Sequence, residues 1–376
     1  MNDEQRKILE MVADGTLTQQ DADRLLEALG PAPEAAPEEE PSQDLGDRIA
    51  KTVEHIVDRS MGAFGPSGDG DLGEKISAAV EEATAAAPEP QTHREEDADS
   101  EPWDEESHTS LMVLAEDAQG EGVHSLVISW ISGEVEVLPW EGSELRITET
   151  ANRPLAEDER MRQTLENGVL TVEWTRKRRR IGPMNLRKRL VVEIPAGVSL
   201  RRVEVNSVSA PVRLEGTAAA GELAVSTVSG KLEAFDLTAP ALKLTTVSGK
   251  LELQGFAGDT VSLNTVSGKL TAHGAARFLE TETVSGKIEL GLEDLPENLS
   301  ANSVSGKIEA TLVLPPEDPR GFTVSYESLS GLFESDFPLT GELKKHHGAG
   351  VYGDGSHRIS METTSGKMEL HRFSSL

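Results

Sequence analysis

One short motif recurs six times in this chain and constrains its fold more than any other feature. The copies align without gaps as VEVNSVSAPVRL (203–214), LAVSTVSGKLEA (223–234), LKLTTVSGKLEL (242–253), VSLNTVSGKLTA (261–272), LETETVSGKIEL (279–290) and LSANSVSGKIEA (299–310). Their central serines are 20, 19, 19, 18 and 20 residues apart. A fixed period of this length is typical of a solenoid, in which each repeat forms one coil.

Within a repeat, the pattern predicts a strand, a corner and a second strand. Leu242, Leu244 and Thr246 alternate with polar residues before the corner, and Leu251 and Leu253 alternate after it. Coils stacked about 4.8 Å apart would align identical side chains in ladders, with the Leu and Ile ladders forming the core. Glycine after the serine in five of the six copies fits a sharp turn with positive φ. The predicted corner residues are Ser229, Gly230, Ser248, Gly249, Ser267, Gly268, Ser285, Gly286, Ser305 and Gly306.

Two further columns of the repeat are the valines that precede the corner serines and the lysines that follow the corner. Strict alternation would leave the valine before each serine facing outward, so we expect a bend or bulge that returns it to the interior. The lysines after the corner (Lys231, Lys250, Lys269, Lys287 and Lys307) resemble a binding stripe. A glutamate stands two residues after most of them, at Glu233, Glu252, Glu289 and Glu309. Mutual neutralisation that keeps the surface soluble is therefore the favoured interpretation.

The stretches on either side extend the same architecture to roughly ten coils over 111–376. HSLVISWISGEVEVLPW (124–140) and SELRITET (143–150) are expected to form the first coils, and Ser330-Gly331 and Ser365-Gly366 repeat the corner near the other end. A basic loop follows residue 175 and is a weak candidate for binding an anion or a partner; a solvated hairpin insertion is the slightly favoured interpretation. Its candidate residues are Arg176, Lys177, Arg178, Arg179, Arg180, Arg187, Lys188 and Arg189.

The amino-terminal part has a different composition. Residues 1–110 hold 29 acidic and 8 basic side chains, a net charge of −21 within a total of −30. We expect a helical hairpin over 1–30, a disordered linker over 31–43, amphipathic helices over 44–86 and an acidic disordered linker over 87–110. The fold class predicted is mainly β, a single-chain β-solenoid with coils of about 19 residues, preceded by an α-helical and partly disordered region.

An apolar stripe runs along the first amphipathic helix, 44–64. Its spacings of three and four residues indicate a partner face. The face consists of Ile49, Val53, Ile56, Val57, Met61 and Phe64. Its polar side mixes both signs of charge, which favours a helical protein partner or a second copy of the chain over peripheral membrane contact through 44–64.

Composition and motifs exclude several classes of function. The chain has no cysteine, and its acidity disfavours nucleic-acid binding. Neither a classical secretion signal nor a run of 18 apolar residues is visible. We find no catalytic constellation and no metal-ligand spacing, and we expect no enzyme activity, no cofactor and no metal.

The T-V-S-G-K-[LI]-E corners, the paired strands SLVISWISGEVEVLPW and the segment RLVVEIPAGVSL resemble the bacterial adhesin-like β-strand-repeat family, a domain family of unknown function. The opening ILEMVADGTLTQQDADRLLEAL resembles the helical-hairpin module that precedes such domains in YvlB-like and LiaX-like proteins. The resemblance implies a link to cell-envelope stress. Many relatives carry Asp after the Ser-Gly corner where this chain has Lys, so the resemblance transfers no acidic site.

Three functions follow as hypotheses. The leading one is a non-enzymatic scaffold that self-associates through its amino-terminal helices and serves an envelope-stress or adhesion-like role. The alternatives are an intracellular regulator that binds a signalling partner through the hairpin, and a carbohydrate-active β-helix. The expected location is cytoplasmic, with or without peripheral contact with the membrane, and the alternative is the cell surface by a non-classical route.

Overall fold

The computed structural model describes residues 107–114, 122–175, 186–315 and 318–373. The predicted elements over 1–30, 31–43 and 44–86, and all but the last residues of 87–110, lie outside these ranges. The described chain is built almost entirely of strands, with one short 3₁₀ helix, η1 (Glu157–Glu159). None of its helices is long and apolar enough to cross a membrane.

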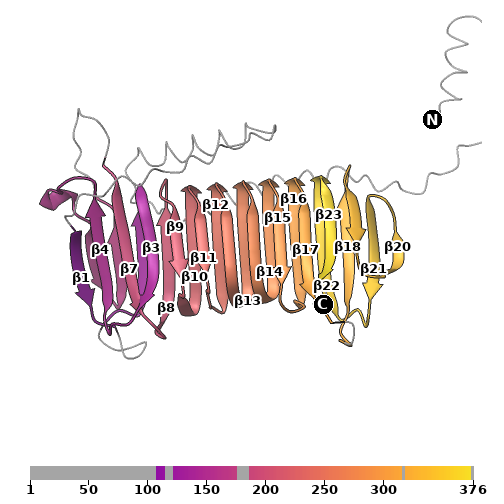
Figure 1. Cartoon of the computed structure of the whole chain (residues 1–376), viewed down its shortest axis with the longest axis horizontal. Coiled ribbons are helices and arrows are strands. Elements are labelled where there is room, and N and C mark those ends of the chain that lie inside the picture. Colours follow the sequence, from indigo (N-terminus) through magenta and orange to yellow (C-terminus); the bar gives the residue numbers. More distant parts are fainter. Residues whose placement is uncertain (1–106, 115–121, 176–185, 316–317, 374–376) are drawn as a thin grey trace, which may run out of the picture. The chain divides into compact units, whose positions relative to one another are not determined.

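The strands of the described residues form a stack of coils (Figure 1). Their pairings give ten coils, each contributing one strand before its corner and one after it. We call the strands before the corners the first sheet and those after them the second sheet. In spatial order, the first sheet contains β5 (Arg162–Glu166), β6 (Val169–Glu173), β2 (Ser125–Trp130), β8 (Ser199–Ser207), β10 (Ala218–Ser229), β12 (Ala241–Ser248), β13 (Leu251–Ser267), β14 (Leu270–Ser285), β16 (Asn298–Ser305), β22 (His357–Ser365), β18 (Phe322–Ser328), β21 (His347–Tyr352) and β20 (Thr340–Leu343).

The second sheet contains β1 (Ser107–Met112), β4 (Leu145–Ala151), β7 (Lys188–Pro195), β3 (Gly133–Trp140), β9 (Val212–Glu215), β11 (Leu232–Phe235), the start of β13, the start of β14, β15 (Ile288–Leu292), β17 (Ile308–Val313), β23 (Lys367–Phe373) and β19 (Leu332–Ser335). The long strands β13 and β14 begin in the second sheet of one coil and end in the first sheet of the next.

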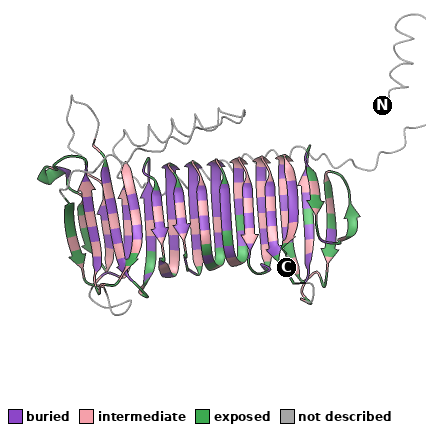
Figure 2. Ribbon diagram, viewed as in Figure 1, coloured by how far each residue is buried: buried purple, intermediate pink, exposed green. Residues whose placement is uncertain are grey.

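The core lies between the two sheets as ladders of identical or similar side chains. One ladder runs through Leu232, Leu251, Leu270, Ile288, Ile308 and Met368, all fully buried. Burial alternates along strands such as β4, β7 and β17, as the period-two pattern requires (Figure 2). The predicted β-solenoid is therefore confirmed for the described residues.

The order of the coils differs from the chain order near both ends. The coil of β2 and β3 lies inside that of β6 and β7, and β4 runs antiparallel to β7. The expectation that 143–150 forms a coil of its own was therefore wrong. Strand β1 adds antiparallel to β4 and begins at Ser107, within the segment predicted as disordered linker, because its backbone completes that sheet edge.

The carboxy-terminal end repeats this arrangement. The last coil in the chain, β22 and β23, inserts between β16/β17 and β18/β19, and strands β21 and β20 close the first sheet with antiparallel pairing. Antiparallel strands thus lie at both ends of the described stack. Such strands break the parallel template that could otherwise recruit further coils.

The valines before the corner serines do not return to the interior as expected. Val208, Val228, Val247 and Val266 are buried, yet none belongs to the contiguous core that contains Leu242, Leu244 and the other interior residues. In β14 and β16, Thr283 and Ser303 are buried whereas Val284 and Val304 are only half-buried, so the alternation continues to this position and the valine column lies on the outward side of the first sheet.

Candidate functional site

The corner residues predicted from the repeat have the expected backbone geometry. Gly230, Gly249, Gly268, Gly286 and Gly306 all have φ between 139° and 150°. A Cβ on Gly268 would lie 2.0 Å from the carbonyl oxygen of Gly249 in the neighbouring coil. Glycine is therefore required for close stacking as well as for the turn, and the corners are structural.

The outward face of the second sheet carries a continuous ladder of lysines and glutamates. Strands β11 to β23 place one lysine at the start of each coil's second strand and, in all of these coils but one, a carboxylate two residues later on the same side. The Nζ to Oε distances are 2.6 Å for Lys231–Glu233 and Lys250–Glu252, 2.5 Å for Lys269–Glu289, 3.0 Å for Lys287–Glu309, 2.9 Å for Lys307–Glu309, 2.5 Å for Lys307–Glu369, and 2.7 Å for Lys367–Glu369 and Lys367–Glu334. Lys287 also pairs with Glu289.

One irregularity shows how the ladder connects neighbouring coils. Thr271 occupies the glutamate position in the coil of Lys269, so Lys269 reaches Glu289 in the next coil. From there the pairs continue without a break to Lys367 and Glu334. Every lysine of the column is thus paired, as the spacing in the sequence suggested.

The pairing shifts the titration of these groups in the direction that keeps them ionised. Hydrogen bonds from Lys307 and Lys367 lower the pKa of Glu369 to about 2. Hydrogen bonds from Lys307 and Lys287 lower the pKa of Glu309, and contacts with Glu369 and Glu309 raise the pKa of Lys307. A carboxyl group that acts as a general acid near neutral pH needs a raised pKa instead.

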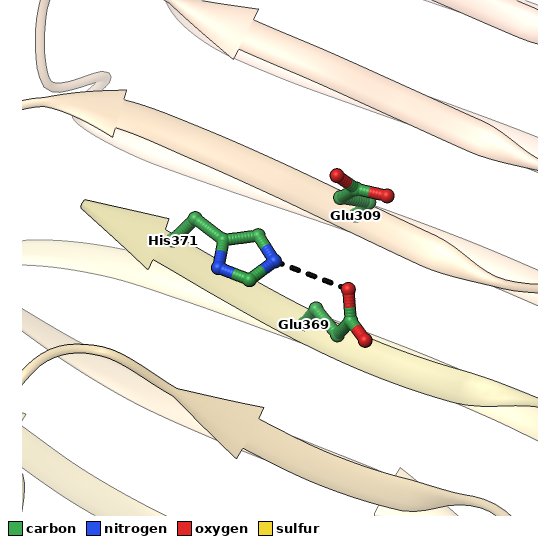
Figure 3. A group of neighbouring side chains, drawn as sticks. All are labelled: Glu309, Glu369 and His371. Carbon is green, nitrogen blue, oxygen red and sulfur yellow. Dashed lines mark hydrogen bonds and ion pairs between the residues drawn. The ribbon is translucent and has the colours of Figure 1, made fainter. Parts of the chain in front are cut away.

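Within the described ranges, the residues that come nearest to a metal site are Glu309, Glu369 and His371 (Figure 3). One ligand atom of each lies within 4.8 Å of the others. Three ammonium groups, those of Lys287, Lys307 and Lys367, already contact the two carboxylates. A cation would have to displace them, so we assign no metal to this cluster.

The His371 ring also joins two coils. Its Nδ1 lies 2.9 Å from Asp336 Oδ2, in the segment after β19, and its Nε2 lies 3.1 Å from Glu369 Oε2. Asp336 and Glu369 raise the pKa of the imidazole. The ring therefore links the terminal coil to β23, and it carries a positive charge in this link when it is protonated.

The predicted basic patch is only partly within the described residues. Arg176 to Arg180 lie outside them. Arg187 is exposed, and Arg189 contacts Glu136 at 2.8 Å. Lys188, in contrast, is completely buried. The prediction that it helps to bind an anion or a partner at the surface is therefore corrected.

Lys188 belongs to a buried polar cluster that the sequence interpretation missed. Its Nζ lies 2.9 Å from Glu149 Oε1, donates to the carbonyl oxygens of Glu159 and Thr175, and lies 5.1 Å from the Trp174 ring centroid. Burial lowers the pKa of Lys188. A signal was available, because Lys188 alternates in phase with the buried residues of β7 and Glu149 with those of β4.

A shallow groove of about 570 Å³ crosses the coils where the second sheet passes into the first. Small residues such as Ala257, Gly258 and Ala276 line it. The arginines at its edge are already paired, Arg277 with Glu297 at 2.9 Å and Arg320 with Asp294 at 2.8 Å. The groove therefore offers no convergent set of free polar groups of the kind that ligand sites use.

These features define a class of protein: a β-solenoid of parallel coils, with antiparallel strands at both ends of the described stack and a self-paired charged ladder. Residues 123–371 match the family model described as Toastrack DUF4097. Because the match covers most of the chain, the protein belongs to this family. The resemblance to the adhesin-like β-strand-repeat family is confirmed.

Solved structures give distant likenesses. A provisionally named cell adhesion protein from Clostridium sporogenes is 10% identical, over 71% of this chain and 100% of that one, with a TM-score of 0.25. A provisionally named adhesin from Bacteroides fragilis is 11% identical, over 72% and 98%, with a TM-score of 0.37. A provisionally named lipid binding protein from Parabacteroides distasonis is 9% identical, over 72% and 98%, with a TM-score of 0.40. No curated protein matches the chain.

Proposed function

We propose that this protein is a non-enzymatic scaffold in which the solenoid is a rigid rod and the amino-terminal helices join copies of the chain. The observation that carries the proposal is the paired ladder on the second sheet. Lysines and carboxylates that could have bound a ligand or catalysed a reaction neutralise one another, from Lys231 to Glu334. Such a surface favours display and solubility over chemistry.

The ends of the stack support the same role. Antiparallel strands at both ends disfavour joining of rods end to end. Contacts between copies would therefore come from outside the solenoid, and the predicted hairpin over 1–30 is the best candidate. We propose that the assembled rods serve a response to envelope stress or an adhesion-like role.

The non-enzymatic part of the proposal is tested by incubating the full chain with cell-wall and capsular polymers and measuring the release of reducing ends. No release is expected. Release that is lost in Glu289→Gln or Glu369→Gln would establish a carbohydrate-active enzyme instead, because these carboxylates belong to the ladder.

The side of the membrane is tested with protease on intact cells that carry an epitope within 111–376. We propose a cytoplasmic location, so the epitope is expected to survive together with a cytosolic control. Loss of the epitope alone would locate the solenoid outside the cell and favour adhesion-like display.

A further inference from the structure

A patch of side chains on the outward side of the first sheet is buried, although the outward side of a solenoid sheet is normally exposed to solvent. Two columns form it, and we call it the outer valine patch. It consists of Val208, Val228, Val247 and Val266, with exposures of 6, 1, 0 and 1%, and Asn206, Ser226, Thr245 and Asn264, with exposures of 2, 9, 0 and 1%.

Hydrogen bonds establish that these columns face outward. Asn206 Nδ2 donates to Glu204 Oε1 at 2.9 Å, and Asn264 Nδ2 donates to Ser262 Oγ at 3.1 Å. Residues two apart in a strand lie on the same side of the sheet. The valine two positions beyond each asparagine continues the same phase, opposite to the core residues.

The burial cannot come from the neighbouring coils alone, because the same columns continue beyond the patch. Val284 and Val304 follow Val266, and Glu282 and Asn302 follow Asn264, with equivalent ladder neighbours on both sides, yet all four are only half-buried. The additional cover is therefore limited to four coils.

Among the described residues, every substantial contact of strands β8, β10 and β12 is with a neighbour in the ladder. Thr245 Oγ1 and Asn264 Oδ1 are buried without a hydrogen-bond partner. The patch thus has the characteristics of a docking surface for an apolar element that supplies few polar groups.

We propose that segment 49–64 of the same chain docks on the outer valine patch as an amphipathic helix. The segment lies outside the described residues, and its sequence supplies the face Ile49, Val53, Ile56, Val57, Met61 and Phe64. As a helix, this face measures about 22 Å along its axis. The outermost valines of the patch are about 14 Å apart at the stacking distance of coils, so the helix would cover all four.

The connection and the composition also favour this occupant. Residues 65–106 join the segment to β1, and that length of chain can span far more than the patch even when it is not extended. The basic loop over 176–185 is the main alternative within the chain, but half of its ten residues are Arg or Lys, and Ile181 and Met184 are its only large apolar residues. It therefore matches a valine surface poorly.

The chain contains no cysteine, so introduced pairs give a clean test in the full-length protein. Ile56→Cys is combined in turn with Val208→Cys, Val228→Cys, Val247→Cys and Val266→Cys, and disulfide formation is measured by mass spectrometry under mild oxidation. We expect an intramolecular disulfide with one or two adjacent positions. Asp58→Cys, on the opposite face of the predicted helix, and Glu252→Cys, on the outward side of the second sheet, are the controls and should not pair.

A second measurement does not depend on disulfide geometry. The rate of maleimide labelling of Val247→Cys is compared with and without Val53→Asp and Ile56→Asp. Labelling is expected to be slow without the two aspartate substitutions and at least tenfold faster with them, whereas Val304→Cys should react rapidly in both backgrounds.

Three outcomes would overturn the proposal. Disulfides formed only between molecules would assign the patch to a second copy. Val247→Cys labelling that is slow in both backgrounds would assign it to a different cover, and labelling that is fast in both would mean that the patch is open.

Discussion

Lys188 Nζ lies 2.9 Å from Glu149 Oε1, and both side chains are completely buried. The pair connects β7 with β4, the antiparallel strand that lies next to the outermost coil. Because the ammonium group also donates to two carbonyl oxygens, its charge is compensated on several sides. The polar cluster thus helps to fix the amino-terminal end of the rod.

Replacing Lys188 should therefore be severely destabilising. Lys188→Met leaves the Glu149 carboxylate buried without its cation, which costs about 3–5 kcal/mol of unfolding free energy. Arg189→Met, at the next residue, removes a partly exposed pair with Glu136 and should cost less than about 1 kcal/mol. Urea unfolding of both variants measures the difference; equal values would contradict the assigned role of Lys188.

The corner glycines should tolerate no side chain. In Gly268→Ala the new Cβ meets the Gly249 carbonyl oxygen at 2.0 Å, so the coils must move apart, at a cost of about 2–4 kcal/mol. Gly197 also has a positive φ, of 80°, but no atom lies within 4 Å of the position of a Cβ. Gly197→Ala should therefore cost only about 1 kcal/mol. Thermal unfolding that ranks the two variants in the opposite order would argue against close stacking at the corners.

The interior ladder is equally specific. Leu251 is fully buried between Leu232 and Leu270, and Leu251→Lys should cost about 3–5 kcal/mol, through lost packing and an unpaired charge. The adjacent outward change, Glu252→Gln, should cost less than about 1 kcal/mol. An unchanged melting temperature in Leu251→Lys would mean that the strand has the opposite phase.

The His371 link predicts a pH dependence with a definite sign. Because Asp336 and Glu369 raise the imidazole pKa in the folded state, the link contributes its full stability below the usual value of 6.5. That contribution is lost as the pH rises through the raised pKa. The melting temperature of the wild type should therefore exceed that of His371→Gln at pH 6, and the difference should shrink by pH 8. A difference that is constant or grows with pH would exclude a charged link.

The repeat predicted the coils because each of their determinants is local. Alternation identifies the core residues such as Leu244 and Leu251, and the Ser-Gly pair marks the corner. The spacing of Lys250 and Glu252 on one face likewise predicted their contact. None of these inferences requires knowledge of which coils are neighbours.

The order of the coils could not be obtained in this way. Ile359 and Met361 of β22 supply interior side chains like those of the other coils. The sequence pattern therefore allows the coil of β22 and β23 to stack either at the end of the rod or one place further in. The structure has the second arrangement, which leaves β18 free to pair with the antiparallel strand β21. Pairing between strands that are far apart in the sequence determines the order of the coils, and a local repeat contains no information about that pairing.

The valine column shows a different limitation. Its apolar character suggested the interior, whereas the column faces outward in the structure and is buried only at Val208, Val228, Val247 and Val266. Hydrophobicity predicts burial but does not specify the side of the sheet on which burial occurs. The same kind of error affected Lys188. Its charge suggested an exposed position, whereas its place in the alternation of β7 is on the buried side.

Light scattering of the full-length chain over a hundredfold range of concentration tests the scaffold proposal most directly. Self-association through the hairpin predicts a mass that rises with concentration, and a monomer at all concentrations for the hairpin variant Leu25→Glu with Leu26→Glu. A wild-type protein that stays monomeric throughout the range would contradict self-association through the amino-terminal helices, and with it the proposed scaffold.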